Sequence, residues 1–409
     1  MISAQRILRR CDELARHSEL AGGLTRVFLS QENRAVNELV LGWMREAGMA
    51  ARLDAIGNVA GRYEGERPGL PCLMLGSHLD TVRDAGKYDG MLGVVAAIEC
   101  IEVLHLQKKK LPFALEVIGF GDEEGVRFGT TLLGSRAVSG TFDKKNLLSV
   151  DAKGISLEKA LNDFGLDPTR IPEAARKKGE VLAYAELHIE QGPVLEAEGL
   201  AVGVVTAING FSRLRVTLAG VAGHAGTVPM ILRRDALAAA AECVLAVEHV
   251  GRGAPELVAT VGKIEALPGA INVIPGDVSI TIDVRAPKDE LRQGAVEEIR
   301  NAISASCKKR QIAAKIEDLQ SQGVAACAGW LMAQMDAAVA AEGLKLRRLP
   351  SGAGHDGMAI QALADICMLF VRCKGGISHN PAEAITEEDA GAGARVLARF
   401  IERFSPRRP

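Results

Sequence analysis

The fold can be inferred from the stretch CLMLGSHLD, residues 72–80, in which an apolar run ends at a histidine and an aspartate. A second apolar run, ALEVIGFG at 114–121, ends at the acidic triplet DEE, 122–124. Between them, residues 91–107 space their apolar side chains as a helix does. Strand–helix–strand alternation of this kind predicts a largely parallel sheet covered by helices. Open α/β sheets keep their chemistry at strand ends, so the polar residues found there are candidate site residues.

The same alternation continues on both sides of this stretch. Before it we predict a helix at 31–48 and a strand at 50–62 with Gly57 and Asn58 at a bend. After it we predict a helix near 131–139, a polar excursion at 141–180 with one short helix, and a strand from 181. Near the end of the chain we predict a helix at 328–342, strands at 344–349 and 366–371, and a helix at 388–403.

From residue 213 the order of predicted strands and helices changes. Strand patterns at 213–219, 256–264, 278–284 and 312–319 alternate with helical patterns at 233–250 and 289–307. That order is β-α-β-β-α-β, a compact ferredoxin-like unit. We therefore predict an α/β protein in two domains. A catalytic domain with a mostly parallel sheet spans 1–212 and 326–409, and the inserted domain spans 213–325.

Composition narrows the class of protein. The 409 residues exceed what one core normally supports, and 48% hydrophobic with 24% charged residues is typical of a globular protein. The net charge of −2 offers no basic surface, so we expect no nucleic-acid partner. No apolar stretch approaches ~20 residues, so we expect no membrane partner. Eight cysteines form no Cys-x-x-Cys pair, which favours a reducing, cytoplasmic location.

Histidines and carboxylates without nearby thiols are the ligands of a hydrolytic divalent-metal site. A pair of ions needs about five protein ligands, with one carboxylate shared between them. Asp80 is placed to orient the imidazole of His78, and Glu123 could move a proton from the attacking water to the leaving nitrogen. A single histidine in such a loop is more often structural, so the prediction rests on the full set. The candidate ligands are His78, Asp89, Glu124, His188 and His379.

Several motifs in order along the chain resemble one known family. They are GSHLDTV at 76–82, YDG at 88–90, DEEGVRF at 122–128, HIEQGP at 188–193, GHAGTVPM at 223–230, NVIPG at 272–276, DVR at 283–285, SGAGHD at 351–356 and GGISHNP at 375–381. The sequence resembles the M20 metallopeptidase family. It is most similar to the branch that contains allantoate amidohydrolase, N-carbamoyl-L-amino-acid hydrolase and β-ureidopropionase. The resemblance runs from about residue 30 to 385, nearly the whole chain.

The resemblance implies a two-metal amide hydrolase. Asp89 would bridge the ions, with His78 and His188 on one ion and Glu124 and His379 on the other. Glu123 would be the general base. Zinc is the expected occupant, although the same ligands accept Mn, Co or Ni. The inserted domain would act as a lid and form a homodimer.

A second group of residues is predicted to hold the substrate. A guanidinium matches a carboxylate bidentately, which favours Arg285, and an imidazole could donate to the oxygen that gains charge. Arg213 could equally be a charge on a strand face. In the resembling family the loop histidine reaches into the partner subunit's site. The candidates for substrate binding are Gln191, Arg213, His224, Asn272, Arg285 and His355.

These expectations predict hydrolysis of the carbamoyl C–N bond of a ureido acid, with allantoate preferred. N-carbamoyl-L-amino-acid hydrolase and β-ureidopropionase are alternatives, followed by an aminoacylase or peptidase and by a non-catalytic metal-binding protein. Allantoate carries two ureido groups, so its pocket should be polar on both sides, whereas an apolar carbamoyl amino acid needs an apolar wall. The segment VRCKGG at 371–376 departs from the proline- and serine-containing loop of several relatives, which leaves the choice of substrate open.

Overall fold

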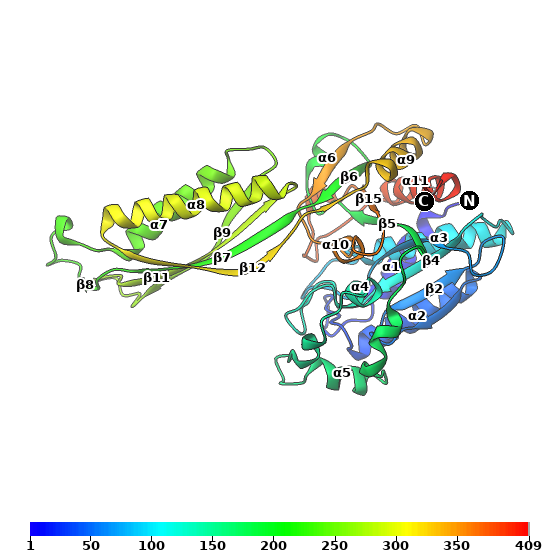
Figure 1. Cartoon of the computed structure of the whole chain (residues 1–409), viewed down its shortest axis with the longest axis horizontal. Coiled ribbons are helices and arrows are strands. Elements are labelled where there is room, and N and C mark those ends of the chain that lie inside the picture. The colour runs from blue at the N-terminus through cyan, green and yellow to red at the C-terminus, as the bar shows by residue number, and fades with distance from the viewer. Residues whose placement is uncertain (408–409) are drawn as a thin grey trace. The chain divides into compact units, whose positions relative to one another are not determined.

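The computed structural model describes residues 1–407, which form two compact units (Figure 1). The first unit comprises Met1–Thr206, Cys327–Leu349 and the described residues from Ala353 on. The second comprises Ala207–Ala326 and Pro350–Gly352. The predicted insertion, 213–325, lies within the second unit, which starts earlier because its first strand begins at Gly210.

The main sheet has the strand order β1-β2-β4-β3-β5-β15-β6-β13, with β14 paired to β6. The four central strands, β4-β3-β5-β15, are parallel, as predicted, and the strands at both edges run antiparallel. The central strands are β3 (Cys72–His78), β4 (Ala114–Phe120), β5 (Val181–Ile189) and β15 (Ile366–Val371). The edge strands are β1 (Ala50–Leu53), β2 (Val59–Tyr63), β6 (Val202–Ile208), β13 (Ala325–Ala326) and β14 (Arg348–Ser351).

Long helices cover one face of this sheet. α3 (Met91–Leu106) is apolar on all sides and almost entirely buried, because it packs on β3 and β5 and is covered in turn by α1 and α11. The side chains of Ser30 and Thr386 cap α2 and α11 by accepting main-chain N–H groups. The covering helices are α1 (Ala4–Ala15), α2 (Gln31–Glu46), α9 (Gly329–Ala341) and α11 (Glu387–Arg403).

A buried ion pair attaches the N-terminal helix to the core. Glu99 of α3 has no exposed side-chain surface and accepts the Nε and Nη2 of Arg6 at 2.6 and 2.8 Å. It also accepts the main-chain N–H of Ser3 at 2.7 Å. Because Ser3 is the N-cap of α1, one carboxylate fixes both the start and the first turn of that helix.

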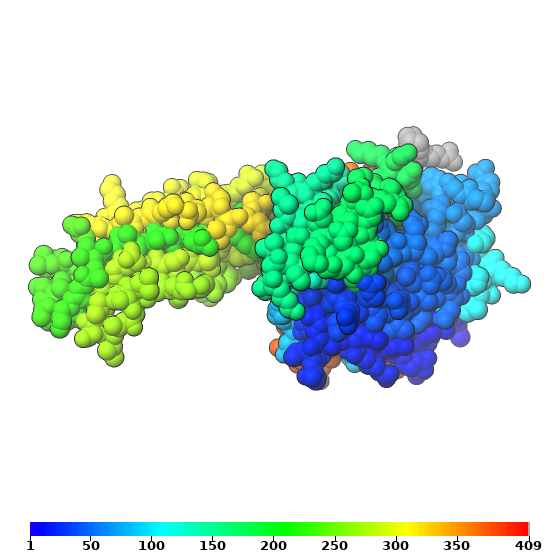
Figure 2. Space-filling view, turned by 90° about the horizontal axis from the view of Figure 1, so that it is seen from below, coloured from blue at the N-terminus to red at the C-terminus, as the bar shows by residue number. Residues whose placement is uncertain are grey.

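The polar excursion at 141–180 carries more structure than predicted. It contains α5 (Leu157–Asp163) and two 3₁₀ helices, η1 (Lys144–Leu148) and η2 (Pro168–Ala174), beside α4 (Leu133–Val138). Leu157, Leu161 and Phe164 share a separate apolar cluster with Phe28. In Figure 2 this teal-to-green segment lies on the surface beside the blue N-terminal residues.

Two predicted strands differ in detail. The strand predicted at 50–62 is a hairpin of β1 and β2, because the Asp54 side chain accepts the main-chain N–H groups of Ile56, Gly57 and Asn58 and closes a turn. The strand predicted at 344–349 is β14, Arg348–Ser351. All eight cysteines are buried and unpaired. None of the helices in residues 1–407 is long and apolar enough to cross a membrane.

The second unit has the predicted β-α-β-β-α-β order. Its antiparallel sheet runs β12-β7-β11-β9, and two helices pack on one face. Its elements are β7 (Gly210–Ala219), α7 (Ala236–Gly251), β9 (Val258–Leu267), β11 (Asp277–Ala286), α8 (Asp289–Arg310) and β12 (Ala313–Gln322). β8 (Gly223–His224) and β10 (Val273–Ile274) form a small separate ribbon.

Strand alternation in this unit separates an apolar face from a charged one. Leu214 and Val216 of β7 and Ile282 of β11 belong to the core under the helices. The residues between them point to the opposite face, where Arg213 is the cross-strand neighbour of Asp283. This face therefore carries charged side chains of the sheet, while the other face packs under the helices.

Candidate metal centre

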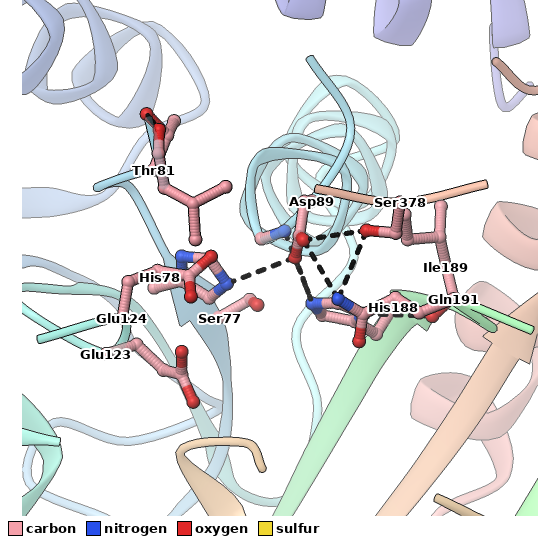
Figure 3. A network of polar contacts seen from close by, with 12 residues as sticks. Ser77, His78, Thr81, Asp89, Glu123, Glu124, His188, Ile189, Gln191 and Ser378 are labelled. Carbon is pink, nitrogen blue, oxygen red and sulfur yellow. Dashed lines mark hydrogen bonds and ion pairs between the residues drawn. The ribbon is translucent and has the colours of Figure 1, made fainter. Parts of the chain in front are cut away.

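Three imidazoles from separate parts of the first unit converge on the carboxylate of Asp89. Figure 3 shows two of them, those of His78 and His188, beside Asp89. His78 ends β3 and His188 lies near the end of the adjacent parallel strand β5. Oδ1 of Asp89 lies 3.4 Å from Nε2 of His78 and 3.1 Å from Nε2 of His188. Oδ2 lies 3.2 Å from Nε2 of His379. The two oxygens thus face different imidazoles, as a carboxylate shared by two cations requires.

The main chain fixes which nitrogen of each strand-end imidazole is available. Nδ1 of His78 lies 2.9 Å from the carbonyl oxygen of Asp80, and Nδ1 of His188 lies 2.9 Å from that of Ile189. A carbonyl only accepts, so Nδ1 carries a proton and Nε2 is the nitrogen that faces Asp89; it donates to the carboxylate while protonated and offers a lone pair once that proton is lost. This is the tautomer that a metal ligand needs, and the donor set fits a divalent cation.

Two glutamates complete the cluster from the loop after β4. Oε1 of Glu124 lies 3.5 Å from Nε2 of His379. The ligand atoms of His78, Asp89 and His188 lie within 4.8 Å of one another, and so do those of Asp89, Glu124 and His379. The structure therefore brings together all five predicted ligands, in two groups that share Asp89. A further group joins His78 to Glu123 and Glu124.

The cluster carries more negative charge than its surroundings neutralise. Burial raises the pKa of Glu123 well above its ordinary value, and the neighbouring Glu124, Asp356 and Asp80 add to the effect. Burial together with Asp89 raises the pKa of Glu124 to about 7. Burial opposes ionisation of Asp89 too, but hydrogen bonds from the three imidazoles keep its pKa well below the ordinary value. Crowded buried carboxylates of this kind are stabilised by a bound cation.

Asp80 acts differently from the prediction. Its carboxylate, expected to orient the imidazole of His78, lies 3.8 Å from Nδ1, beyond hydrogen-bond range. Instead Oδ1 and Oδ2 accept the main-chain N–H groups of Glu123 and Glu124 at 3.1 and 3.2 Å. The reason is topological, because β3 and β4 are adjacent parallel strands and the N–H groups of the second strand-end loop need acceptors.

Other polar residues surround Asp89. Gln191, predicted to bind substrate, places Nε2 2.9 Å from Oδ2 of Asp89 and 3.2 Å from Oγ of Ser378. The single O–H of Ser378 lies between two carboxylates, with Oγ 2.9 Å from Oδ2 of Asp89 and 3.1 Å from Oε2 of Glu383. Sequence reasoning missed Ser378 and Glu383, although both flank His379 in the motif GGISHNPAE at 375–383.

His355, also predicted to bind substrate, is buried beneath the cluster. Its side chain is 1% exposed, and its ring meets the ring of His188 edge-on at 4.4 Å between centroids. Burial and the neighbouring His188 lower its pKa well below the ordinary value, so the ring is neutral. With Glu186 and His188 it forms another close group of potential ligands. In this structure His355 therefore supports His188 from behind.

The remaining predicted substrate residues lie in the second unit, in two places. His224 on β8 is the cross-strand neighbour of Val273 on β10, and the carbonyl of Asn272 accepts the N–H of Ala225 at 2.9 Å. The N–H of Gly226 donates to Nδ1 of His224 at 3.0 Å, so the neutral ring carries its proton on Nε2, as the predicted donor role requires.

Arg213 and Arg285 lie together on the charged face of the larger sheet. Asp283 accepts Nε of Arg213 at 3.0 Å and Nε and Nη2 of Arg285 at 2.8 and 3.1 Å. Nη1 of Arg285 donates to the carbonyl of Gly352 at 2.9 Å. Both guanidinium groups lie over the ring of Phe211, at 4.7 and 5.9 Å from its centroid. Arg285 is therefore held in a single orientation.

An open α/β sheet with buried histidines and carboxylates at its strand ends defines a metal-dependent hydrolase. Residues 74–403 match the family described as peptidase family M20/M25/M40. The chain belongs to this family, and it is a hydrolase that acts on carbon–nitrogen bonds.

Relatives of known activity cover almost the whole chain. An N-carbamoyl-L-amino acid amidohydrolase of Geobacillus stearothermophilus is 42% identical, over 97% of each chain. Allantoate deiminase 1 of Glycine max is 39% identical, over 97% of this chain and 88% of its own length. The crystal structure of an amidase of the hydantoinase/carbamoylase family from Burkholderia multivorans superposes with a TM-score of 0.92 at 31% identity, over 98% of this chain and 97% of its own.

Proposed function

We propose that this chain is a two-metal amidohydrolase that cleaves the carbamoyl C–N bond of a ureido acid, with allantoate as its preferred substrate. The observation that carries the proposal is the carboxylate of Asp89, whose two oxygens face separate histidines beside Glu123 and Glu124. The activities of the Geobacillus and Glycine relatives support the same reaction class.

The ligand sets follow from the grouping of the side chains. His78, Asp89 and His188 would hold one cation, and Asp89, Glu124 and His379 the other. Two divalent cations, when bound, would polarise the carbonyl oxygen and make a water acidic enough to attack it at neutral pH. We propose zinc as the occupant, since four-coordinate sites of imidazole and carboxylate ligands suit it. Mn, Co and Ni accept the same ligands.

Glu123 is the proposed proton carrier. Its carboxylate is buried next to the proposed ligands, and the same burial raises its pKa, which makes it a stronger base than an exposed carboxylate. It would accept the proton of the attacking water and deliver it to the nitrogen that leaves. Asp80 contributes by fixing the main chain of residues 123 and 124, so that adjacent side chains keep different roles.

Substrate binding is proposed for the polar residues that the sequence singled out. Arg285 would receive the carboxylate of the substrate. Nε and Nη2 already donate to Asp283 and Nη1 donates to the carbonyl of Gly352, so one N–H on each of Nη1 and Nη2 remains for the substrate. Asn272 and Gln191 would hold the ureido amide, and His224 would donate to the attacked carbonyl through Nε2. His355 would act through His188.

One observation favours allantoate over a carbamoyl amino acid with an apolar side chain. Arg213 lies beside Arg285 and shares Asp283 with it, so the neighbourhood of the carboxylate-binding guanidinium is polar. Allantoate carries a second ureido group that such a neighbourhood suits. N-carbamoyl-L-amino-acid hydrolysis is the second candidate, and the 42% identity to the Geobacillus enzyme favours it.

A panel assay separates these candidates. The metal-reconstituted protein would be tested with allantoate, N-carbamoyl-β-alanine and several N-carbamoyl-L-amino acids, and ammonia release would be measured. We expect the highest kcat/KM for allantoate. A higher kcat/KM for an apolar N-carbamoyl-L-amino acid would replace allantoate by the second candidate. Absence of ammonia from all of them would overturn the ureido-acid proposal.

We also propose a homodimer formed through the second unit. Large apolar side chains are exposed near the β8–β10 ribbon, at Val221, Met230, Ile231, Leu232 and Ile271. Exposed apolar patches of this kind mark interaction sites. Light scattering of the full chain should give twice the chain mass, and a monomer at micromolar concentration would contradict the proposal.

A further inference from the structure

We propose that Glu383 is a positioning residue that clamps the Asp89 loop to the His379 loop and so determines how tightly the second cation, held by Asp89, Glu124 and His379, is bound. The inference rests on the proposed pair of cations and adds a residue to which neither the motifs nor the ligand set gives a role.

Glu383 joins two segments that are almost three hundred residues apart in sequence. It is 4% exposed, and its Oε1 accepts the main-chain N–H groups of Tyr88 at 2.8 Å and Asp89 at 3.2 Å. Its Oε2 accepts the hydroxyl of Ser378 at 3.1 Å. One carboxylate therefore holds the backbone beneath the bridging aspartate and the residue immediately before His379.

The contacts continue from Ser378 to the ligand atoms. The Ser378 hydroxyl lies 2.9 Å from Oδ2 of Asp89 (Figure 3). The same oxygen of Asp89 lies 3.2 Å from Nε2 of His379. Glu383, Ser378 and Asp89 thus form a closed circuit, because Glu383 contacts both the side chain of Ser378 and the main chain of Asp89. Movement of Glu383 would displace Oδ2 relative to His379.

Gly86, three residues before Asp89, packs directly against the side chain of Glu383. A Cβ built on Gly86 would lie 2.3 Å from the Cβ and the carboxyl carbon of Glu383, well inside contact distance. The glycine lets the Asp89 loop approach the glutamate closely enough for both main-chain hydrogen bonds. The clamp therefore depends on two residues: the buried carboxylate of Glu383, which accepts the hydrogen bonds, and Gly86, which lets the loop come close to it.

The two proposed cation sites differ in how much they need such a clamp. His78 and His188 come from adjacent buried strands, are 2% and 1% exposed, and have Nδ1 fixed by main-chain carbonyls. His379 is 50% exposed and lies on a loop with a left-handed backbone, φ 53°. Loss of Glu383 should therefore weaken the second site far more than the first.

The test is the number of metal ions bound, measured by elemental analysis of the full chain after equilibration against buffered zinc. We expect about two ions for the unaltered chain and about one for Glu383→Ala, because outer hydrogen-bond partners change metal affinity by about 10–100-fold. Glu383→Gln should keep about two, since its amide oxygen can accept both N–H groups and its NH₂ can donate to Ser378. Glu388→Ala, an exposed glutamate on the same segment, is the matched control and should also keep two.

Each outcome decides the inference. Two tightly held ions in Glu383→Ala, or equal loss of both ions, would overturn the clamp. If Glu383→Gln also lost one ion, the hydrogen bonds that the amide can replace would not explain the tight binding of the second cation, and the clamp would be overturned. If Glu383→Ala does not fold, Ser378→Ala replaces it, because that change removes the link to Oδ2 while the main-chain contacts stay; unchanged zinc affinity there would also overturn the clamp. Fewer than two ions in the unaltered chain would instead contradict the proposed two-metal centre.

Discussion

The carboxylate of Asp80 accepts the main-chain N–H of Glu123 at 3.1 Å, so the residue that follows the first ligand strand fixes the position of the proposed general base. The second oxygen accepts the N–H of Glu124 at 3.2 Å. Glu123 is the proposed base and Glu124 a proposed ligand. The positions of both therefore depend on the contact that Asp80, after β3, makes with the loop after β4.

Replacement of Glu123 by glutamine should abolish most of the activity. The amide cannot carry the proton from water to the leaving nitrogen, so we expect kcat to fall by about 10²–10⁴-fold. The bound zinc should stay near two ions per chain, because Glu123 is not among the proposed ligands. Steady-state ammonia release and elemental analysis measure the two quantities, and retained turnover would exclude Glu123 as the base.

Replacement of Arg285 by alanine should act mainly on KM. A hydrogen bond to a charged group contributes about 1.5–3 kcal/mol, so KM for a carboxylate substrate should rise by roughly 10–150-fold. Asp283→Asn should give a smaller rise, since Arg285 would keep its charge and lose its fixed orientation. Lys263→Ala, an exposed charge in the same sheet, is the control. An equal loss of activity on a substrate amide that lacks the carboxylate would contradict this role.

Metal uptake should increase with pH. Glu124 has a pKa of about 7, raised chiefly by burial, and its protonated form cannot bind a cation. The pKa of His78 is also raised, because the Asp89 hydrogen bond, Glu123 and Asp80 outweigh the effect of burial, and this ring too must lose a proton. Below these raised pKa values protons compete with zinc for Glu124 and His78. The zinc affinity of the metal-free chain should therefore fall as the pH drops from 8 to 6. Titration calorimetry at several pH values would show this, and a flat profile would argue against these ligands.

Removal of the Glu99 carboxylate should destabilise the first unit. Glu99→Ala leaves the N–H of Ser3 without its acceptor and removes one of the two carboxylates that pair with Arg6, since Glu102 remains at 3.2 Å. Losing hydrogen bonds to a charged group costs about 1.5–3 kcal/mol. Urea unfolding followed by circular dichroism measures the change. Arg170→Ala, which breaks an exposed ion pair with Glu173, should leave the transition unchanged. Equal effects of the two changes would contradict the account of how α1 is attached.

The sequence allowed much of the fold and the clustering of the candidate ligands to be predicted, because both depend on regular patterns. His78 and Glu124 each follow an apolar run that could only be a strand, and parallel strands bring such ends to one edge. The hairpin at β1 and β2 was missed because its turn depends on the side chain of Asp54. The spacing of apolar residues does not indicate where a side chain will close a turn.

The supporting contacts could not be predicted for a different reason. Glu383 meets Tyr88 across 295 positions of sequence, and no local pattern relates the two residues. The role of Asp80 depended on which of two acceptors, its carbonyl or its carboxylate, lay nearer Nδ1 of His78. Such choices are settled by tertiary packing.

The carbonyl acceptors behind His78 and His188 also bear on how this enzyme can change. Since the peptide backbone selects the ring tautomer, substitutions among surrounding side chains leave the Nδ1 contact of both proposed ligands intact. Mutation can therefore remodel the substrate pocket while the strand-end half of the metal centre keeps its chemistry, which gives selection freedom to vary one without endangering the other.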